Sequence, residues 1–190
     1  TTGKIAVEYD FNGSTMGYAS YTIGSKPGGT NLTYGFSTRE ELDAAFRFTS
    51  PVVTPMVFRA FESENLESLE FGLKSDFFNG KARANIAVFS YDYENLQFQA
   101  TDPDPYRGGV ANIPNSEMDG VEIEFTALLG DSITFDMNLG FIDTEVTSEY
   151  EVLDNVLAYQ YFFDEEQERY DLREDVKGNM LAKTPEFTAD

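Results

Sequence analysis

The sequence has no cysteine and no histidine among its 190 residues. The absence of cysteine excludes a disulfide framework and a thiolate metal site, although it does not fix the compartment. The absence of histidine removes the commonest general base and the commonest metal ligand. Since no nucleophile motif is present either, we expect neither an enzyme nor a resident cofactor or metal.

Basic residues are scarce, with 13 Lys and Arg against 34 Asp and Glu and a net charge of -21. This charge would repel phosphate, so we expect no nucleic-acid partner. No apolar run approaches the length of about 20 residues that a transmembrane helix needs. The sequence starts without Met or a signal peptide, within one predicted strand, and stops within another. We therefore expect it to be an internal piece of a larger protein.

The longest regular pattern covers residues 66–97, which we predict to be two strands around a short turn. Its first half alternates apolar residues such as Leu69 and Phe71 with polar residues such as Ser68 and Glu70. Side chains of a strand point alternately to opposite faces, so one face is apolar and the other polar. Soluble strands usually end after about five or six residues, whereas these continue for the length that a tilted strand needs to cross a bilayer. The segment predicts a transmembrane β-hairpin.

The same alternation recurs in residues 4–11, 16–25, 118–129 and 133–141, and residues 184–190 have the pattern of a strand opening. Short turn signals join these strands in pairs; they lie at Asn12-Gly13, Asn79-Gly80 and Gly130-Asp131. A two-residue loop at the first turn predicts the pairs Tyr9–Met16 and Val7–Tyr18. A three-residue loop at the last turn predicts the pair Leu129–Ile133, which aligns the apolar residues of both strands.

The register at Asn79-Gly80 decides which residues face lipid. A two-residue loop would place Ile86 and Val88 on the face of Leu69, whereas a three-residue loop would place Phe89, Tyr91 and Tyr93 there. We favour the three-residue loop because it builds an aromatic band at the far end of the strand. We also expect a cross-strand ion pair between Asp76 and Arg83.

The connections between these hairpins are long and irregular and cover residues 26–65, 100–117 and 148–183. Short helices are possible around residues 38–48 and in the middle of the last connection. Strict alternation of short and long connections is typical of outer-membrane barrels, which have short periplasmic turns and long extracellular loops. We therefore expect one lipid-facing set on a single antiparallel sheet, exposed in the bare chain: Leu69, Phe71, Leu73, Val121, Ile123, Phe125, Phe135, Met137 and Leu139.

Four segments resemble the TonB-dependent outer-membrane receptors. They are YASYTIGSKPGGTN, ENLESLEFGLKSDFFNGKARANIAVFSYDYENLQ, SEMDGVEIEF and KTPEFTAD, and they occur in order over nearly the whole chain. The resemblance implies an all-β antiparallel meander of six to seven strands over residues 1–190, as part of a 22-stranded barrel. The plug domain, the remaining strands and the TonB box are absent from the sequence, so TonB would be reached through a plug outside it.

The resemblance also implies active import of a scarce nutrient across the bacterial outer membrane, with outer-membrane lipid as a partner. An iron–siderophore complex is the commonest cargo of the family, and import of a vitamin or an oligosaccharide is the alternative. From a different class, a soluble β-sandwich that binds carbohydrate is the alternative, in which Phe71, Phe125 and Phe135 would be buried.

We expect ligand capture in the long connections, where loops carry most binding residues. The candidates are aromatic or basic: Tyr34, Arg59, Tyr106, Arg107, Tyr159, Tyr161 and Arg169. Packing of loop against loop explains them equally well. Glu122 and Glu124 have a separation that suits a glycosidase pair, but a polar lumen face is the better explanation. Asp102, Asp104 and the acidic run 164–175 are better explained as solvated surface than as cation ligands.

Overall fold

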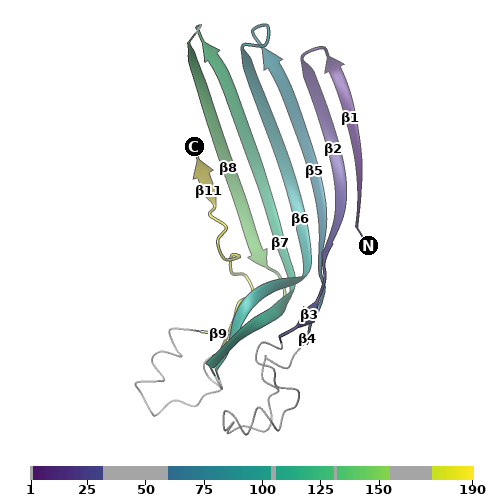
Figure 1. Ribbon diagram of the computed structural model, residues 1–190, viewed down its shortest axis with the longest axis vertical. Helices are drawn as coiled ribbons and strands as arrows, with labels where there is room; N and C mark the ends of the chain where they lie inside the picture. The colour runs from purple at the N-terminus through teal and green to yellow at the C-terminus, as the bar shows by residue number, and fades with distance from the viewer. Residues whose placement is uncertain (1, 32–59, 104–105, 131, 155–172) are drawn as a thin grey trace.

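Seven strands lie side by side in one antiparallel sheet (Figure 1). The computed structural model describes residues 2–31, 60–103, 106–130, 132–154 and 173–190. The strand order is β1-β2-β5-β6-β7-β8-β11. The bounds are β1 Gly3–Asn12, β2 Thr15–Lys26, β5 Glu64–Phe77, β6 Ala82–Pro103, β7 Tyr106–Leu129, β8 Ile133–Val146 and β11 Phe187–Ala189.

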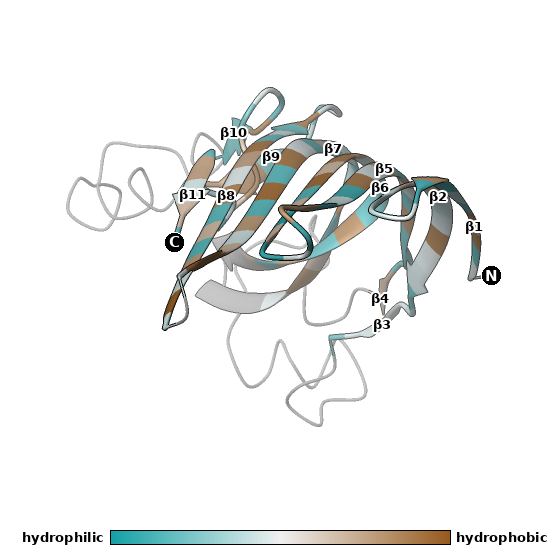
Figure 2. Cartoon of the chain, turned by 90° about the horizontal axis from the view of Figure 1, so that it is seen from above, coloured by the Kyte–Doolittle hydropathy of each residue, from teal (hydrophilic) through white to brown (hydrophobic). Residues whose placement is uncertain are grey.

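Two small sheets flank this meander at the end with the long connections. They pair β3 (Gly29–Thr30) with β4 (Ala60–Phe61), and β9 (Glu151–Leu153) with β10 (Arg173–Asp175). Seen from above, the main sheet is a curved arc that does not close (Figure 2). Among the described residues, no helix is long and apolar enough to cross a membrane.

The strand pairing places the predicted lipid-facing set on one side of the sheet, which confirms its orientation. Residues directly opposite each other share a face, and one such row runs Phe71–Val88–Val121–Phe141–Phe187 across five strands. We call this side the apolar face. Leu69, Phe71, Leu73 and Phe135 are exposed there, at 44%, 53%, 41% and 45%. The other five members of the set are half-buried by their neighbours, so the expectation of full exposure was only partly right.

The apolar face is not the inner face of a sandwich, because the long strands all belong to a single sheet. Along β8 its apolar residues extend from Ile133 to Phe141, about 27 Å at about 3.4 Å per residue. This length, measured along a tilted strand, matches the lipid-facing band of outer-membrane barrels, which is about 25 Å tall. The soluble β-sandwich is therefore wrong.

The register favoured for the central hairpin is also wrong. Phe77 pairs with Ala82, so the loop has four residues, and Phe71 lies opposite Val88. A four-residue loop has the same parity as a two-residue loop, so Ile86 and Val88 lie on the apolar face. The turn is made by Phe78, Asn79 and Gly80, whose φ angles are 54°, 58° and 81°.

Phe89, Tyr91 and Tyr93 consequently lie on the opposite side, which we call the polar face, and not in a lipid-facing girdle. The Phe89 ring lies across Gly120, and the Tyr18 ring lies across Gly72, where an added Cβ would sit only 2.0 Å from the ring. Aromatic rings thus cover glycines of neighbouring strands on this face. This contact needs glycine because of its missing side chain.

The two other short turns differ in outcome. Leu129 pairs with Ile133 as predicted. Tyr9 pairs with Gly17 and Val7 with Ala19, so the predicted pairs with Met16 and Tyr18 are wrong. The shift arises because the turn lies between Asn12 and Thr15 and an irregularity separates Asp10 from Asn12. The observed register places Val7 opposite Ala19, which in turn lies opposite Phe71, so all three residues lie on the apolar face.

Candidate functional site

Most of the predicted ligand-capture residues lie outside the described residues: Tyr34, Arg59, Tyr159, Tyr161 and Arg169. Tyr106 and Arg107 open β7, where their backbones pair with Pro103 and Asp102. The long loop predicted over residues 100–117 is therefore wrong, because β6 and β7 continue through it as paired strands. Prolines did not stop these strands. The roles of the seven candidates remain predictions, as do the possible helices, which fall mostly outside the described residues.

The polar face within the long strands carries hydrogen-bonded pairs. Arg83 donates to Asp76 through Nε at 2.7 Å and Nη2 at 3.1 Å, which confirms the predicted ion pair. Tyr18 donates to Glu70 at 2.6 Å. Asn85 donates to Glu124 at 3.0 Å, so this carboxylate belongs to the polar face, as the lumen interpretation expects. The described residues contain no Asp/Glu cluster suited to a metal ion.

The long-connection end is held together by side-chain amides. Asn31 exchanges two hydrogen bonds with the backbone of Val110, at 2.7 and 2.8 Å. Gln97 donates to the carbonyl oxygens of Pro27 and Glu62, both at 3.0 Å. Asn112 accepts from the Glu62 N–H at 2.8 Å. These bonds tie both ends of the first long connection to β6 and β7.

The ladder between β6 and β7 changes at Asn95 and Pro114. Asn95 has a φ of 58°, and Pro114 has no N–H to donate, so neither joins the otherwise regular pairing. Beyond this point the hairpin turns aside from the sheet (Figure 1). The bend lets the hairpin approach the β9–β10 pair, where the rings of Phe98 and Tyr150 meet edge to face at 5.8 Å and 84°.

One carboxylate organises the β9–β10 pair. Asp175 Oδ1 accepts from the backbone N–H groups of Tyr150 at 2.9 Å and Lys177 at 3.1 Å. These two bonds favour the charged form and lower the pKa of Asp175. Lys177 also lies 3.7 Å from Glu149 in an exposed ion pair, which contributes little to stability.

The segment after β10 runs along the edge of β8 opposite β7 and contacts polar-face side chains of that strand. Leu181 N–H donates to Thr144 Oγ1 at 3.0 Å, and the hydroxyls of Thr144 and Thr184 are 3.0 Å apart. Thr144 is only 3% exposed. Val146 exchanges backbone hydrogen bonds with Asn179 and Gly178. The chain thus forms a cover over this end of the polar face.

A cavity of about 550 Å³ lies beneath this cover. Its wall is mostly apolar and includes Phe98, Met118, Val146, Val152, Met180 and Leu181. Such a volume and lining are typical of sites for small molecules. We take this cavity, which we call the polar-face cavity, as the candidate site. The sequence analysis missed it, although Met118 and Val146 are apolar residues at polar-face positions of otherwise alternating strands.

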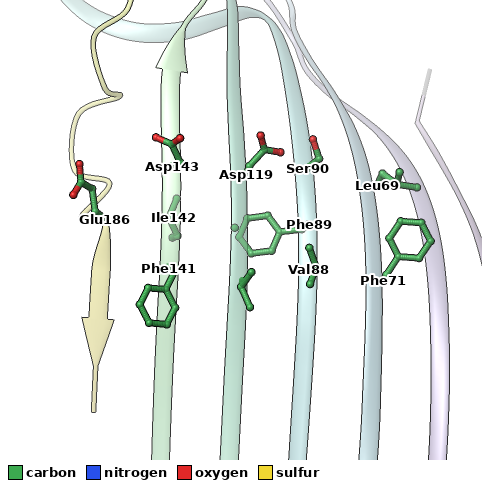
Figure 3. A pocket seen from close by; sticks show the side chains of 12 residues that line it. Leu69, Phe71, Val88, Phe89, Ser90, Asp119, Phe141, Ile142, Asp143 and Glu186 are labelled. Atoms are coloured by element: carbon green, nitrogen blue, oxygen red, sulfur yellow. The ribbon is translucent and has the colours of Figure 1, made fainter.

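A second hollow, of about 680 Å³, lies on the apolar face (Figure 3). Phe71, Val88 and Phe141 line its floor, and Asp119 and Asp143 lie at its edge in the next row of the sheet. The row beyond places Glu67, Asp92, Glu117 and Glu145 side by side across four strands. The hollow therefore marks where the apolar band ends, and it belongs to the lipid-facing surface.

Comparisons with known proteins agree with this architecture. The family model described as "TonB dependent receptor-like, beta-barrel" matches residues 1–190. The "Probable TonB-dependent siderophore receptor PiuA" of Acinetobacter baumannii is 26% identical over 136 residues, which cover 72% of this chain and 16% of that protein.

Two solved structures share the fold. The ferric yersiniabactin uptake receptor FyuA from Yersinia pestis superposes with a TM-score of 0.60 at 15% identity, over 99% of this chain and 22% of that chain. The copper transporter OprC superposes with a TM-score of 0.53 at 18% identity, over 76% of this chain and 20% of that one. The chain thus spans about a fifth of these relatives' length.

Proposed function

Because the chain belongs to the TonB-dependent receptor-like β-barrel family, we propose that it forms part of a receptor that imports an iron–siderophore complex across the bacterial outer membrane. TonB would supply the energy through a plug domain. The chain's own contribution is a section of barrel wall, with lipid on the apolar face and the import path on the polar face. It carries no enzymatic step.

The observation that carries this proposal is the polar-face cavity at the long-connection end of membrane-spanning strands. A pocket there faces the barrel interior, where a ligand arriving from outside would be held. PiuA is named as a siderophore receptor and FyuA as a ferric yersiniabactin receptor, and these names support the choice of ligand class. Vitamin or oligosaccharide import remains the alternative within the same fold.

The test is uptake of radioactive iron by a Gram-negative bacterial strain from which the other iron receptors have been deleted. We expect the receptor that contains this chain to restore uptake of at least one ferric siderophore, and a strain without TonB to lose that uptake. Labelled cobalamin and labelled maltooligosaccharides serve as control ligands, which test import of a vitamin or an oligosaccharide. Uptake of one of these, with no ferric siderophore taken up, would contradict the proposal and favour the alternative.

A further inference from the structure

The polar-face cavity has an unusual composition for this protein. None of the described residues that line it is charged, although charged residues make up 25% of the chain and the net charge is -21. Glu151 and Asp175 of the β9–β10 pair and Glu149, just before β9, are close in sequence to lining residues but do not line the cavity themselves. The described lining is therefore neutral and mostly apolar, within an acidic protein.

Its lining also suits a ligand of irregular shape. Tyr93 and Phe98 provide rings from β6, while Met118 on β7 and Met180 in the covering segment provide flexible thioethers. Methionine adapts to irregular apolar surfaces and makes favourable contacts with aromatic rings. A charged group would lose its water on entering and find no ionic partner among the described lining residues, so its entry is unfavourable.

One buried polar atom next to the cavity, outside its lining, has no hydrogen-bond partner among the described residues. Ser116 is 1% exposed, and its Oγ has no hydrogen-bond partner among the described residues. Ser116 lies directly between Tyr93 and Val146 in the sheet, and both of these residues line the cavity. Buried hydroxyls are nearly always hydrogen-bonded.

We propose that the polar-face cavity binds an uncharged aromatic or aliphatic part of the transported ligand, and so selects ferric siderophores that carry a neutral aryl or acyl group over polycarboxylate complexes. This inference rests on the proposed uptake function. The iron centre itself lies outside the cavity, since the polar oxygen donors of the siderophore that surround it would lose their water there and meet no charged partner among the described lining residues. Specificity then arises from the cost of burying charge rather than from a charged contact.

Thiol labelling tests the cavity independently of transport. This chain has no cysteine. Leu181→Cys therefore places its only thiol in the lining of the cavity, at a position outside the long strands. Lys183→Cys is the matched control, two residues away and not part of the lining. Both variants, in the intact membrane-embedded receptor, react with neutral benzyl methanethiosulfonate and with anionic sulfonatoethyl methanethiosulfonate. We expect the ratio of the neutral to the anionic rate to be at least about tenfold higher at position 181 than at 183. Equal ratios would overturn the inference whatever the receptor transports.

Protection by ligand then joins the cavity to uptake. Ferrioxamine B and its N-benzoyl derivative have the same iron centre, but the first carries an ammonium group and the second a neutral aryl amide. We expect the benzoyl derivative to slow benzyl labelling at position 181 and not at 183, and ferrioxamine B to protect less. If position 181 reacts preferentially with the neutral reagent but the benzoyl derivative protects it no better than ferrioxamine B, the ligand assignment is overturned. The uptake assay tests the proposed function separately. If Leu181→Cys fails to assemble, Met180→Cys replaces it.

Discussion

The membrane-spanning sheet and its long-connection end are stabilised in different ways. In the sheet, a regular ladder joins strand to strand, as in the register from Asn65–Glu94 to Phe77–Ala82 between β5 and β6. At the long-connection end, particular side chains hold irregular backbone, as Asn31 does at Val110. The repeated ladder tolerates many residues at most positions, provided their polarity suits the face; positions under an aromatic ring, such as Gly72, are the exception. The long-connection end depends on individual side chains.

The two regions also treat charge differently. The sheet separates it by face, with apolar rows on one side and pairs such as Asp76–Arg83 on the other. At the long-connection end, the described residues that line the cavity are uncharged, while carboxylates such as Asp175 lie on the adjoining β9–β10 pair. Contact with lipid or with water therefore decides which residues suit each face of the sheet. In the cavity, the cost of removing water from a charged ligand group decides which ligands suit it.

The largest expected effect tests the two faces of the sheet. Phe125→Arg places a charge on the apolar face, where Phe125 pairs with Met137, and should lower barrel stability by about 2–4 kcal/mol. Glu124→Arg, on the adjacent polar-face position, should cost much less. Denaturant titration of the receptor in lipid bilayers measures both. Equal losses would mean that the faces are misassigned.

The sequence predicted these faces because their signal is periodic. Leu69, Phe71 and Leu73 alternate with polar residues. This alternation assigns each residue to a face whichever strand pairs with it and wherever the strand ends. Register was less predictable. Two-, three- and four-residue loops all fit Asn79-Gly80. The four-residue turn has a positive φ at Phe78, which no propensity favours, and it shares with a two-residue loop the register that places Phe89 on the polar face.

A smaller effect is expected from Gly72→Ala on the polar face. The new Cβ would lie 2.0 Å from the Tyr18 ring, so the ring must move and weaken its 2.6 Å hydrogen bond to Glu70. We expect a loss of about 1–3 kcal/mol. Gly24→Ala is the control, because its Cβ would meet Leu66 at an ordinary 3.7 Å. In a Tyr18→Ala background the Gly72 penalty should largely disappear, and a penalty that stays unchanged would show that the ring is not its cause.

Next in size is the central turn. Gly80 has a φ of 81°, a conformation that costs other residues about 1 kcal/mol or more. Gly80→Ala should therefore lower stability by about that amount and slow assembly, without changing the ligand affinity of receptor that does assemble. Gly13→Ala in the first turn is the control, since Gly13 is not among the positive-φ residues and its Cβ would meet no atom within 4 Å. Folding yield and equilibrium binding measure the two effects separately.

The long-connection end was poorly predicted, for a physical reason. Its strands β6 and β7 pass through prolines and glycines that normally end strands, and their pairing depends on distant amides such as Asn31. The polar-face cavity depends on Leu181 meeting Thr144, a contact that no local pattern encodes. Apolar residues at polar-face positions, such as Met118 and Val146, were the available signal.

The smallest expected effect is a pH dependence at this end. The folded-state pKa of Asp175 is lowered by the N–H groups of Tyr150 and Lys177, so the carboxylate stabilises the β9–β10 pair above its unfolded pKa. That contribution is lost as the pH falls through the lowered folded pKa. We expect hydrogen-exchange protection of the Tyr150 and Lys177 amides, corrected for intrinsic rates, to fall in that acidic range. Asp175→Asn should reduce the protection at neutral pH and flatten its pH dependence, whereas Glu174→Gln on the same strand should change neither. An unaltered acid profile in Asp175→Asn would assign the transition to another carboxylate.

Because the covering segment begins directly after Asp175, the same variant should also raise the rate at which a thiol at position 181 reacts with the anionic reagent, as the cavity opens to water.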